Sequence, residues 1–168
     1  AHVVCALQDA GVVLLGKNRV INPEMAAMFA EKRIRKVYWA VVAGRWQPEW
    51  NRLETRIDYG AGKRYRNVVV GGRQAISTFR LLAASDEKSW IEVLPKTGRT
   101  HQVRLHCLAM GRPVLGDKLY GEAAEVPMAL HARRLDLRHP ATGAELSIVA
   151  EPPPYWRDHW LTGLGDES

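Results

Sequence analysis

The sequence lacks most of the features that mark a membrane protein or a disulfide-stabilised secreted protein. Its 168 residues include two cysteines, Cys5 and Cys107, which cannot form a disulfide framework and are more typical of buried thiols in a reducing cytoplasm. No apolar run approaches the roughly 18 residues of a transmembrane helix. The apolar opening stretch, residues 1–15, has no basic region before it and does not match a signal peptide. These absences predict a cytoplasmic protein with no membrane partner.

Residues that bind metal ions are also sparse. His101, His106 and Cys107 lie within one seven-residue stretch, but no second pair of ligands follows at the spacing of a zinc site. The sequence therefore predicts no metal site.

The composition is that of one globular domain. Hydrophobic residues make up 46% of the chain and charged residues 25%, and a chain of this length can bury a core. We therefore expect residues 1–168 to form a single domain. The net charge of +6 favours a polyanionic partner such as a nucleic acid, although many basic proteins bind nothing specific.

The first half of the chain predicts two strands and a helix. A short apolar run at 12–15 lies between glycines and is typical of a buried strand. Asn22, Pro23 and Glu24 suit the start of a helix that runs to about residue 33. A second strand is expected at 36–43, and residues 45–74 are expected to be rich in loops.

The second half predicts two hairpins separated by a helix. Strands are expected at 75–83 and 89–94 around a polar turn, and at 129–138 and 144–150 around the turn 139–143. A helix from about residue 100 to 110 lies between the hairpins, and a short helix is expected after the three prolines at 152–154. Many strands with few helices predict an α+β fold with a mixed, largely antiparallel sheet flanked by a few helices.

The segment 94–106 carries the strongest chemical signal. It lies where a strand ends and a helix begins, and the free N–H groups of a helix start attract anions. Thr100, His101 and Arg104 are expected to share one face of this helix, because they are three and four residues apart. This arrangement suits a phosphate-bearing ligand and an arginine that pairs with a carboxylate. The alternative is an ordinary amphipathic helix with a solvated N-terminus.

Several motifs occur in a fixed order along the chain: G-V-V-L-L-G-K-N at 11–18, K-V-Y-W-A-V-V-A-G at 36–44, T-G-R-T-H-Q-V-R-L-H at 97–106, G-R-P-V-L-G-D at 111–117 with Y-G at 120–121, and L-H-A at 130–132 with H-P-A-T-G at 139–143. Together they resemble the RluA-type RNA pseudouridine synthases over residues 11–156. The second and third motifs are similar to that family's K-x-Y-x-A-x-V-x-G strand and T-G-R-T-H-Q signature. The resemblance implies a pseudouridine synthase-like fold.

The resemblance also implies a reaction. These enzymes isomerise uridine to pseudouridine in ribosomal or transfer RNA by breaking the N-glycosidic bond, turning the uracil and rejoining it through carbon. The target base is flipped out of its stack, an aspartate acts as the nucleophile, and no metal or organic cofactor is needed.

The resemblance assigns roles to individual residues. Tyr38 matches the active-site tyrosine that stacks on the target base and takes part in proton removal. Arg104 matches the arginine that pairs with the catalytic aspartate, and Val103 matches the aliphatic residue that packs against the base, although a plain core valine is equally physical. Basic and polar residues in and around the site are predicted to contact RNA: Arg99, Thr100, His101, Lys17, Lys63, Arg64, Arg66, Arg133 and Arg134.

The chain departs from the family pattern at its N-terminal end. The catalytic aspartate stands in an H-R-L-D motif five residues before the glycine matched by Gly11, and that register places Ala6 at the aspartate position. Arg104 would then need an open, hydrated site or another partner. Asp9 is the nearest carboxylate and a possible substitute only if the loop is rethreaded. The N-terminal strands of the family are also absent or replaced, so a truncated, altered or naturally degenerate chain is expected.

Three functional hypotheses follow from this pattern. The first is an RNA pseudouridine synthase by descent, whose activity depends on whether a nucleophile replaces the one missing at Ala6. The second is a non-catalytic RNA-binding or ribosome-assembly module of the same fold. The third is an inert folded fragment of a larger enzyme.

Overall fold

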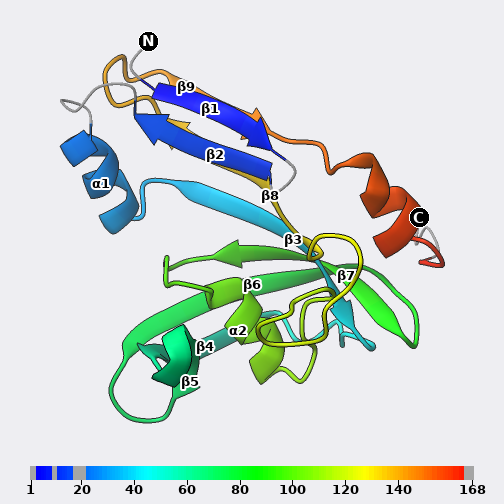
Figure 1. Ribbon diagram of the computed structural model, residues 1–168. Coiled ribbons are helices and arrows are strands. Elements are labelled where there is room, and N and C mark those ends of the chain that lie inside the picture. Colours follow the sequence, from blue (N-terminus) through cyan, green and yellow to red (C-terminus); the bar gives the residue numbers. More distant parts are fainter. Residues whose placement is uncertain (1–2, 9–10, 17–21, 165–168) are drawn as a thin grey trace.

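The computed structural model describes residues 3–8, 11–16 and 22–164. Its strands form one mixed sheet in the order β1-β2-β8-β3-β7-β6-β4-β5, and β9 pairs with β8. Figure 1 shows the sheet running through the whole molecule, with β1, β2, β8 and β9 at one end and β4, β5 and β6 at the other. The strands are Val3–Gln8 (β1), Gly11–Gly16 (β2), Arg35–Ala43 (β3), Arg52–Tyr59 (β4), Tyr65–Val68 (β5), Arg73–Ala84 (β6), Lys88–Pro95 (β7), Leu130–Arg138 (β8) and Glu145–Val149 (β9).

The pairings confirm the predicted fold class. All described pairings are antiparallel except that of β2 with β8, which is parallel and rests on the single register pair Gly11–Ala132. Gly11 has a φ of 104°, and a Cβ there would stand 2.2 Å from the carbonyl oxygen of Ala132. Only glycine lets these two backbones approach so closely, so Gly11 joins the β1–β2 hairpin to the sheet.

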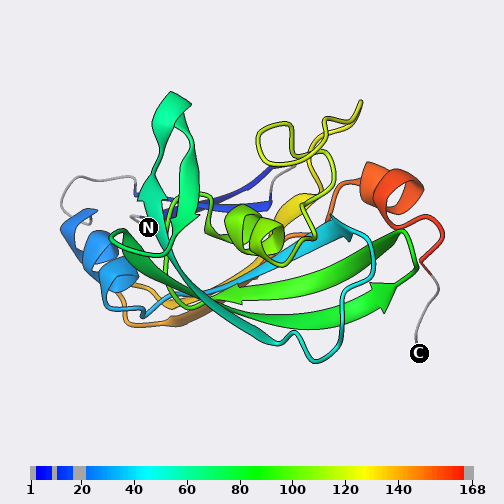
Figure 2. The same cartoon turned by 90° about the horizontal axis from the view of Figure 1, so that it is seen from below.

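Four short helices complete the described structure: α1 (Asn22–Ala30), the 3₁₀ turn η2 (Ala61–Lys63), α2 (Gln102–Ala109) and the π-helix η3 (Trp156–Trp160). Figure 2 shows α2 lying on one face of the sheet and the β4–β5 hairpin projecting on the same side. Within these residues, no helix is long and apolar enough to cross a membrane.

Two sequence expectations are wrong in detail. Residues 45–74 were expected to be rich in loops, but β4, β5 and the start of β6 occupy much of this range. Most of the β4 side chains remain exposed and Ile57 is its only buried residue, so the strand carries charges where a core strand would carry valine or isoleucine. The second error concerns α2, which begins at Gln102 rather than near residue 100, because His101 adopts the left-handed φ of 56° and cannot continue a right-handed helix.

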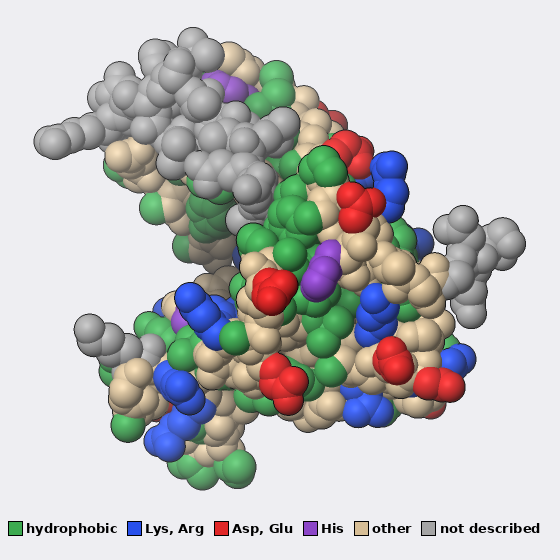
Figure 3. Space-filling view, turned by 45° about the vertical axis from the view of Figure 1, so that its right-hand side comes forward, with side chains coloured by type: hydrophobic (Ala, Val, Ile, Leu, Met, Phe, Trp, Pro, Cys, Tyr) green, Lys and Arg blue, Asp and Glu red, His purple; other side chains and the backbone are tan. Residues whose placement is uncertain are grey.

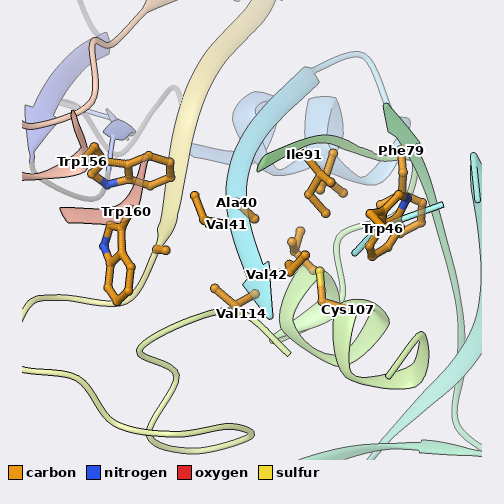
Figure 4. Packing of buried hydrophobic residues seen from close by; sticks show 13 residues of the cluster. Ala40, Val41, Val42, Trp46, Phe79, Ile91, Cys107, Val114, Trp156 and Trp160 are labelled. Carbon is orange, nitrogen blue, oxygen red and sulfur yellow. The ribbon is translucent and has the colours of Figure 1, made fainter. Parts of the chain in front are cut away.

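The main core surrounds β3, the central strand. Ala40, Val41 and Val42 have no exposed surface. Figure 4 shows Trp156 and Trp160 on one side of β3, and Ile91, Phe79 and Trp46 on the other. Because β3 is covered on both sides, its sequence is a nearly continuous apolar run, and this is why the strand was predictable.

The buried thiol predicted for Cys107 is confirmed. Its side chain has no exposed surface, and burial raises the pKa of the thiol to about 12. The side chain of Cys5 lies outside the described part of the chain.

Buried hydrogen bonds fix α2 against the sheet. Gln102 donates from Nε2 to the Ile76 carbonyl at 2.9 Å and to Ser77 Oγ at 3.0 Å. The hydroxyl of Thr97 donates to Gln102 Oε1 at 2.6 Å. One turn further on, the ring nitrogens of His106 lie 2.9 Å from Ser77 Oγ and 3.0 Å from Thr55 Oγ1. These bonds hold the segment 97–106 in one register, which positions the side chains of the site.

The buried His106 predicts a pH-dependent stability. Burial lowers the pKa of His106 to about 4 in the folded protein, whereas an exposed histidine titrates near 6.5. Between these values the unfolded chain binds more protons, so the free energy of unfolding should rise with pH from about 4 to about 6.5, by at most about 3 kcal/mol. Urea unfolding at a series of pH values measures this rise. In His106→Gln the rise over this window should be much smaller, and an unchanged rise would contradict the assignment.

Candidate active-site cleft

A cleft of about 310 Å³ opens between the start of β3 and the segment that leads into α2. Figure 3 shows the molecule hollowed on one side, with Lys and Arg side chains along the lower edge of the hollow. A second cavity of about 220 Å³ adjoins the cleft, and both are lined by Lys36 and Tyr38. The cleft itself is lined by Lys36, Tyr38, Pro95, Thr97, Gly98, Arg99, His101, Gln102, Val103, Arg104, Met128 and Leu130.

Tyr38 stands between the two cavities. It belongs to β3, where it pairs with Val93 of β7 and Ala132 of β8, and the β3–β8 register shifts between Val37 and Tyr38. Its ring packs beside the main core while part of it remains accessible. Burial raises the pKa of Tyr38, so its hydroxyl is protonated at neutral pH and can donate a hydrogen bond. The predicted site tyrosine therefore lies in the cleft.

Arg104 lies in the cleft and is already paired. Its Nε and Nη2 donate to the two carboxylate oxygens of Asp117 at 2.7 and 2.6 Å. Its guanidinium also lies over the ring of Tyr120, 4.9 Å from the centroid. Without an aspartate at position 6, Arg104 was expected to need either an open, hydrated site or another partner. The structure shows another partner, Asp117, in the loop after α2.

Asp117 is the buried half of this pair, with 1% of its side chain exposed. It also accepts hydrogen bonds from the backbone N–H groups of Leu119 and Tyr120 at 3.0 and 3.2 Å. Burial alone would raise the pKa of Asp117, but the hydrogen bonds from Arg104 and these two N–H groups outweigh burial and lower it. The carboxylate is therefore charged at neutral pH and holds the Nε–Nη2 edge of the guanidinium.

The predicted shared helical face of Thr100, His101 and Arg104 is wrong, because the first two residues precede the helix. His101 caps α2 from a left-handed conformation, and its Nδ1 lies 2.9 Å from the hydroxyl of Tyr120. Burial and the neighbouring Arg104 lower the pKa of His101, although Asp117 acts in the opposite direction. His101 and Arg104 nevertheless meet, because both line the cleft and both contact Tyr120. Thr100 is exposed and is not among the cleft-lining residues.

Val103 and Arg99 complete the predicted set in the cleft. Val103 is 7% exposed and belongs to both the core and the cleft wall, so its position is compatible with either of the roles considered for it. Arg99 lines the cleft and donates from Nε to the carbonyl of Gln74 at 2.8 Å. Burial and the neighbouring Arg73 lower the pKa of Arg99.

The other predicted RNA contacts are not brought together. Arg64 and Arg66 line a separate groove beside α2 and Tyr120. Arg133 is paired with Glu151 at 2.8 Å and stacks over Trp39, and Arg134 is paired with Asp136 at 2.8 Å while it lines the second cavity. Lys17 and the side chain of Lys63 lie outside the described part of the chain.

The N-terminal segment differs from the expected catalytic loop. Residues 3–8 form β1, which pairs with β2 in a hairpin, and Ala6 is the register partner of Val13. Val13 lines the second cavity together with Tyr38. Position 6 is therefore one strand away from a wall of the site, and Asp9 lies outside the described residues.

Sequence reasoning did not single out Lys36, Asp117 and Tyr120 as site residues. Lys36 shares the K-x-Y motif with Tyr38, and Asp117 and Tyr120 stand in motifs that support the resemblance without assigning a role to either residue. Asp117 lies thirteen positions after Arg104, and no local sequence pattern indicates that the two side chains pair. No cluster of three or more metal-binding side chains occurs among the described residues.

Comparison with known proteins gives one consistent result. The family model described as RNA pseudouridylate synthase matches residues 9–109. The dual-specificity RNA pseudouridine synthase RluA of Haemophilus influenzae is 32% identical over 152 residues, which cover 86% of this chain and 69% of that protein. The ribosomal large subunit pseudouridine synthase C of Rickettsia felis is 31% identical over 92% of this chain and 53% of its own length. The chain thus spans about half of the Rickettsia protein.

A solved structure shares the fold. Human RNA pseudouridylate synthase domain containing 4 superposes with a TM-score of 0.72 over 88% of this chain and 69% of that chain, at 21% identity. The motifs, the sheet topology and these matches agree, and the chain belongs to the RNA pseudouridylate synthase family, within it to the RluA type.

Proposed function

We propose that this protein binds RNA, takes a flipped uridine into the cleft, and has the site of an RNA pseudouridine synthase whose nucleophile position is occupied by Ala6. One observation carries the proposal. Tyr38 from β3, and Val103 and Arg104 from α2, line one cleft, although Tyr38 and Val103 are 65 positions apart in the sequence. The resemblance assigns roles to these three residues from sequence motifs alone, independently of their arrangement in space.

The cleft suits a single nucleoside. Its volume of about 310 Å³ lies at the lower end of small-molecule sites, which span roughly 300–1,000 Å³. One aromatic ring, one aliphatic wall and a few polar groups are typical of proteins that take an unstacked base from RNA. Arg99 and His101 at the rim add positive or polar contacts where the RNA backbone would pass.

The arrangement of Arg104 leaves room for a carboxylate. Asp117 occupies Nε and Nη2, and Nη1 makes no hydrogen bond to another described residue. Asp117 therefore orients the guanidinium, and Arg104 still has donors to offer a second carboxylate. Because alanine supplies neither a nucleophile nor a charge, the chain as written is proposed to bind uridine in RNA without isomerising it.

The substrate class follows from the relatives. One relative is named for the ribosomal large subunit and another for dual specificity. We therefore propose ribosomal RNA as the first substrate and transfer RNA as the second. The alternative, a non-catalytic RNA-binding or ribosome-assembly module, is favoured by the alanine at position 6 and predicts the same binding without any gain of activity on restoring the carboxylate.

Restoring the carboxylate is the direct test of the site. Ala6→Asp should release tritium from RNA that contains 5-tritiated uridine, whereas the unaltered chain and Ala6→Asn should release none, because only aspartate provides a nucleophile. Release by the unaltered chain would contradict the register, and a further Asp9→Asn substitution would show whether Asp9 is responsible. Binding by Ala6→Asp without tritium release would favour the non-catalytic module.

The base-stacking role of Tyr38 can be tested without turnover. Tyr38→Ala should weaken binding of a uridine-containing RNA stem-loop about tenfold, because stacking of one base on an aromatic ring is lost. Tyr38→Phe keeps the ring and should bind within about twofold of the unaltered chain. Fluorescence anisotropy at low salt measures both affinities. Equal binding by Tyr38→Ala would show that the base does not enter this cleft.

A further inference from the structure

The positive charges around the two cavities are not equally available to a ligand. Four basic side chains line these cavities: Lys36, Arg99, Arg104 and Arg134. Arg104 is paired with Asp117 and Arg134 with Asp136, and neither aspartate lines either cavity. Arg99 is bound to the backbone of β6. Arg99 thus has a hydrogen bond but no carboxylate partner among the described residues, and Lys36 is the one of the four for which neither an ion pair nor a hydrogen bond of the charged group is described.

Lys36 occupies the central position of the site. It lines both the cleft and the second cavity, as Tyr38 does, and it precedes Tyr38 by two positions on β3. Within the described part of the chain, Lys36 forms no ion pair and no hydrogen bond from its ammonium, and neither cavity is lined by an acidic residue. Burial lowers the pKa of Lys36. The site therefore holds a partly desolvated cation that lacks an anion.

Gly98 makes space for this ammonium. A Cβ at position 98 would stand 3.3 Å from Lys36 Nζ, so the ammonium lies directly against the backbone of the turn that leads into α2. The backbone φ of Gly98 is not in the left-handed region, so glycine is not required there by its conformation. The missing side chain leaves the ammonium open to the cleft.

We propose that Lys36 binds the phosphate next to the nucleotide that Tyr38 receives, and so fixes the RNA backbone while the base is in the cleft. This inference rests on the proposed function and adds the group that holds the backbone. A phosphate is the anion that RNA brings to every position. A lysine serves it as a point charge with three donors, and a partly desolvated ammonium gains more from such a pair than a solvated one does.

The test couples one side chain to one phosphate. Uridine-containing RNA stem-loops are made with each loop phosphate replaced in turn by an uncharged methylphosphonate, and their affinities are measured by fluorescence anisotropy. For the unaltered chain, one replacement beside the target uridine should weaken binding about tenfold. Lys36→Met should weaken binding of unmodified RNA by a similar factor, and the same methylphosphonate should then cause no further loss. The slope of log affinity against log salt should fall by about 0.7 to 0.9.

Two further variants distinguish the loss of a phosphate contact from a general effect on folding or charge. Lys88→Met is the matched control, because Lys88 is also partly buried with a lowered pKa but pairs with Ala43 at the far end of β3, about 23 Å along the strand from Lys36. It should leave affinity and salt slope unchanged. Gly98→Ala retains the lysine but places a methyl group against its ammonium, and should weaken binding and the phosphate coupling. Thermal unfolding confirms that each variant is folded.

The outcomes separate this inference from the proposed function. RNA binding that depends on Tyr38 but shows no coupling between Lys36 and any single phosphate would overturn the phosphate contact and leave the uridine cleft in place. A chain that binds no RNA even at low salt would overturn both.

Discussion

The site depends on the ion pair between Arg104 and Asp117. A guanidinium that is 16% exposed and a carboxylate that is 1% exposed are costly to remove from water, and the loss of either partner from such a pair costs about 3–5 kcal/mol. The cost is offset here because both carboxylate oxygens are used by the arginine and two backbone N–H groups add to them. The pair ties α2 to the loop that follows it, and Tyr120 in that loop reaches His101 at the rim of the cleft. One interaction thus sets the positions of Arg104, His101 and the cleft wall between them.

The sequence allowed the fold to be predicted where local patterns and burial agreed. The strand 36–43 is covered on both sides, and the two hairpins around 85–88 and 139–143 are marked by polar turns, so each was found close to its observed bounds. Strand β4 was not predicted, because most of its side chains are exposed and charged residues in an exposed strand look like those of a loop in the sequence. The start of α2 was misplaced because His101 takes a left-handed conformation that few residues other than glycine adopt.

The candidate site was predictable only in part, and the reason is distance along the chain. Tyr38, Val103 and Arg104 were found because each stands in a recognisable motif, and the structure brings them to one cleft. The partner of Arg104 was not found, since nothing local to a sequence shows which carboxylate a buried arginine will meet. The same limit applies to Lys36. Its motif was visible, but its lack of a counter-ion follows only from the arrangement of β3, the turn at Gly98 and the cavities on either side.

The ion pairs also reduce the number of positive charges that are available to bind a phosphate. The formal value of +6 favours a polyanionic partner, and several arginines were predicted to contact RNA. Arg133 and Arg134 are engaged with Glu151 and Asp136, so a phosphate would have to compete with a carboxylate at each of them. At cations that lack a carboxylate partner, a phosphate would meet no such competition. The ammonium of Lys36, for which no carboxylate partner is described, lines the same two cavities as Tyr38. In the proposed function, a cation that can bind a phosphate therefore lies next to the site of the flipped base, and this arrangement sets the register along the RNA.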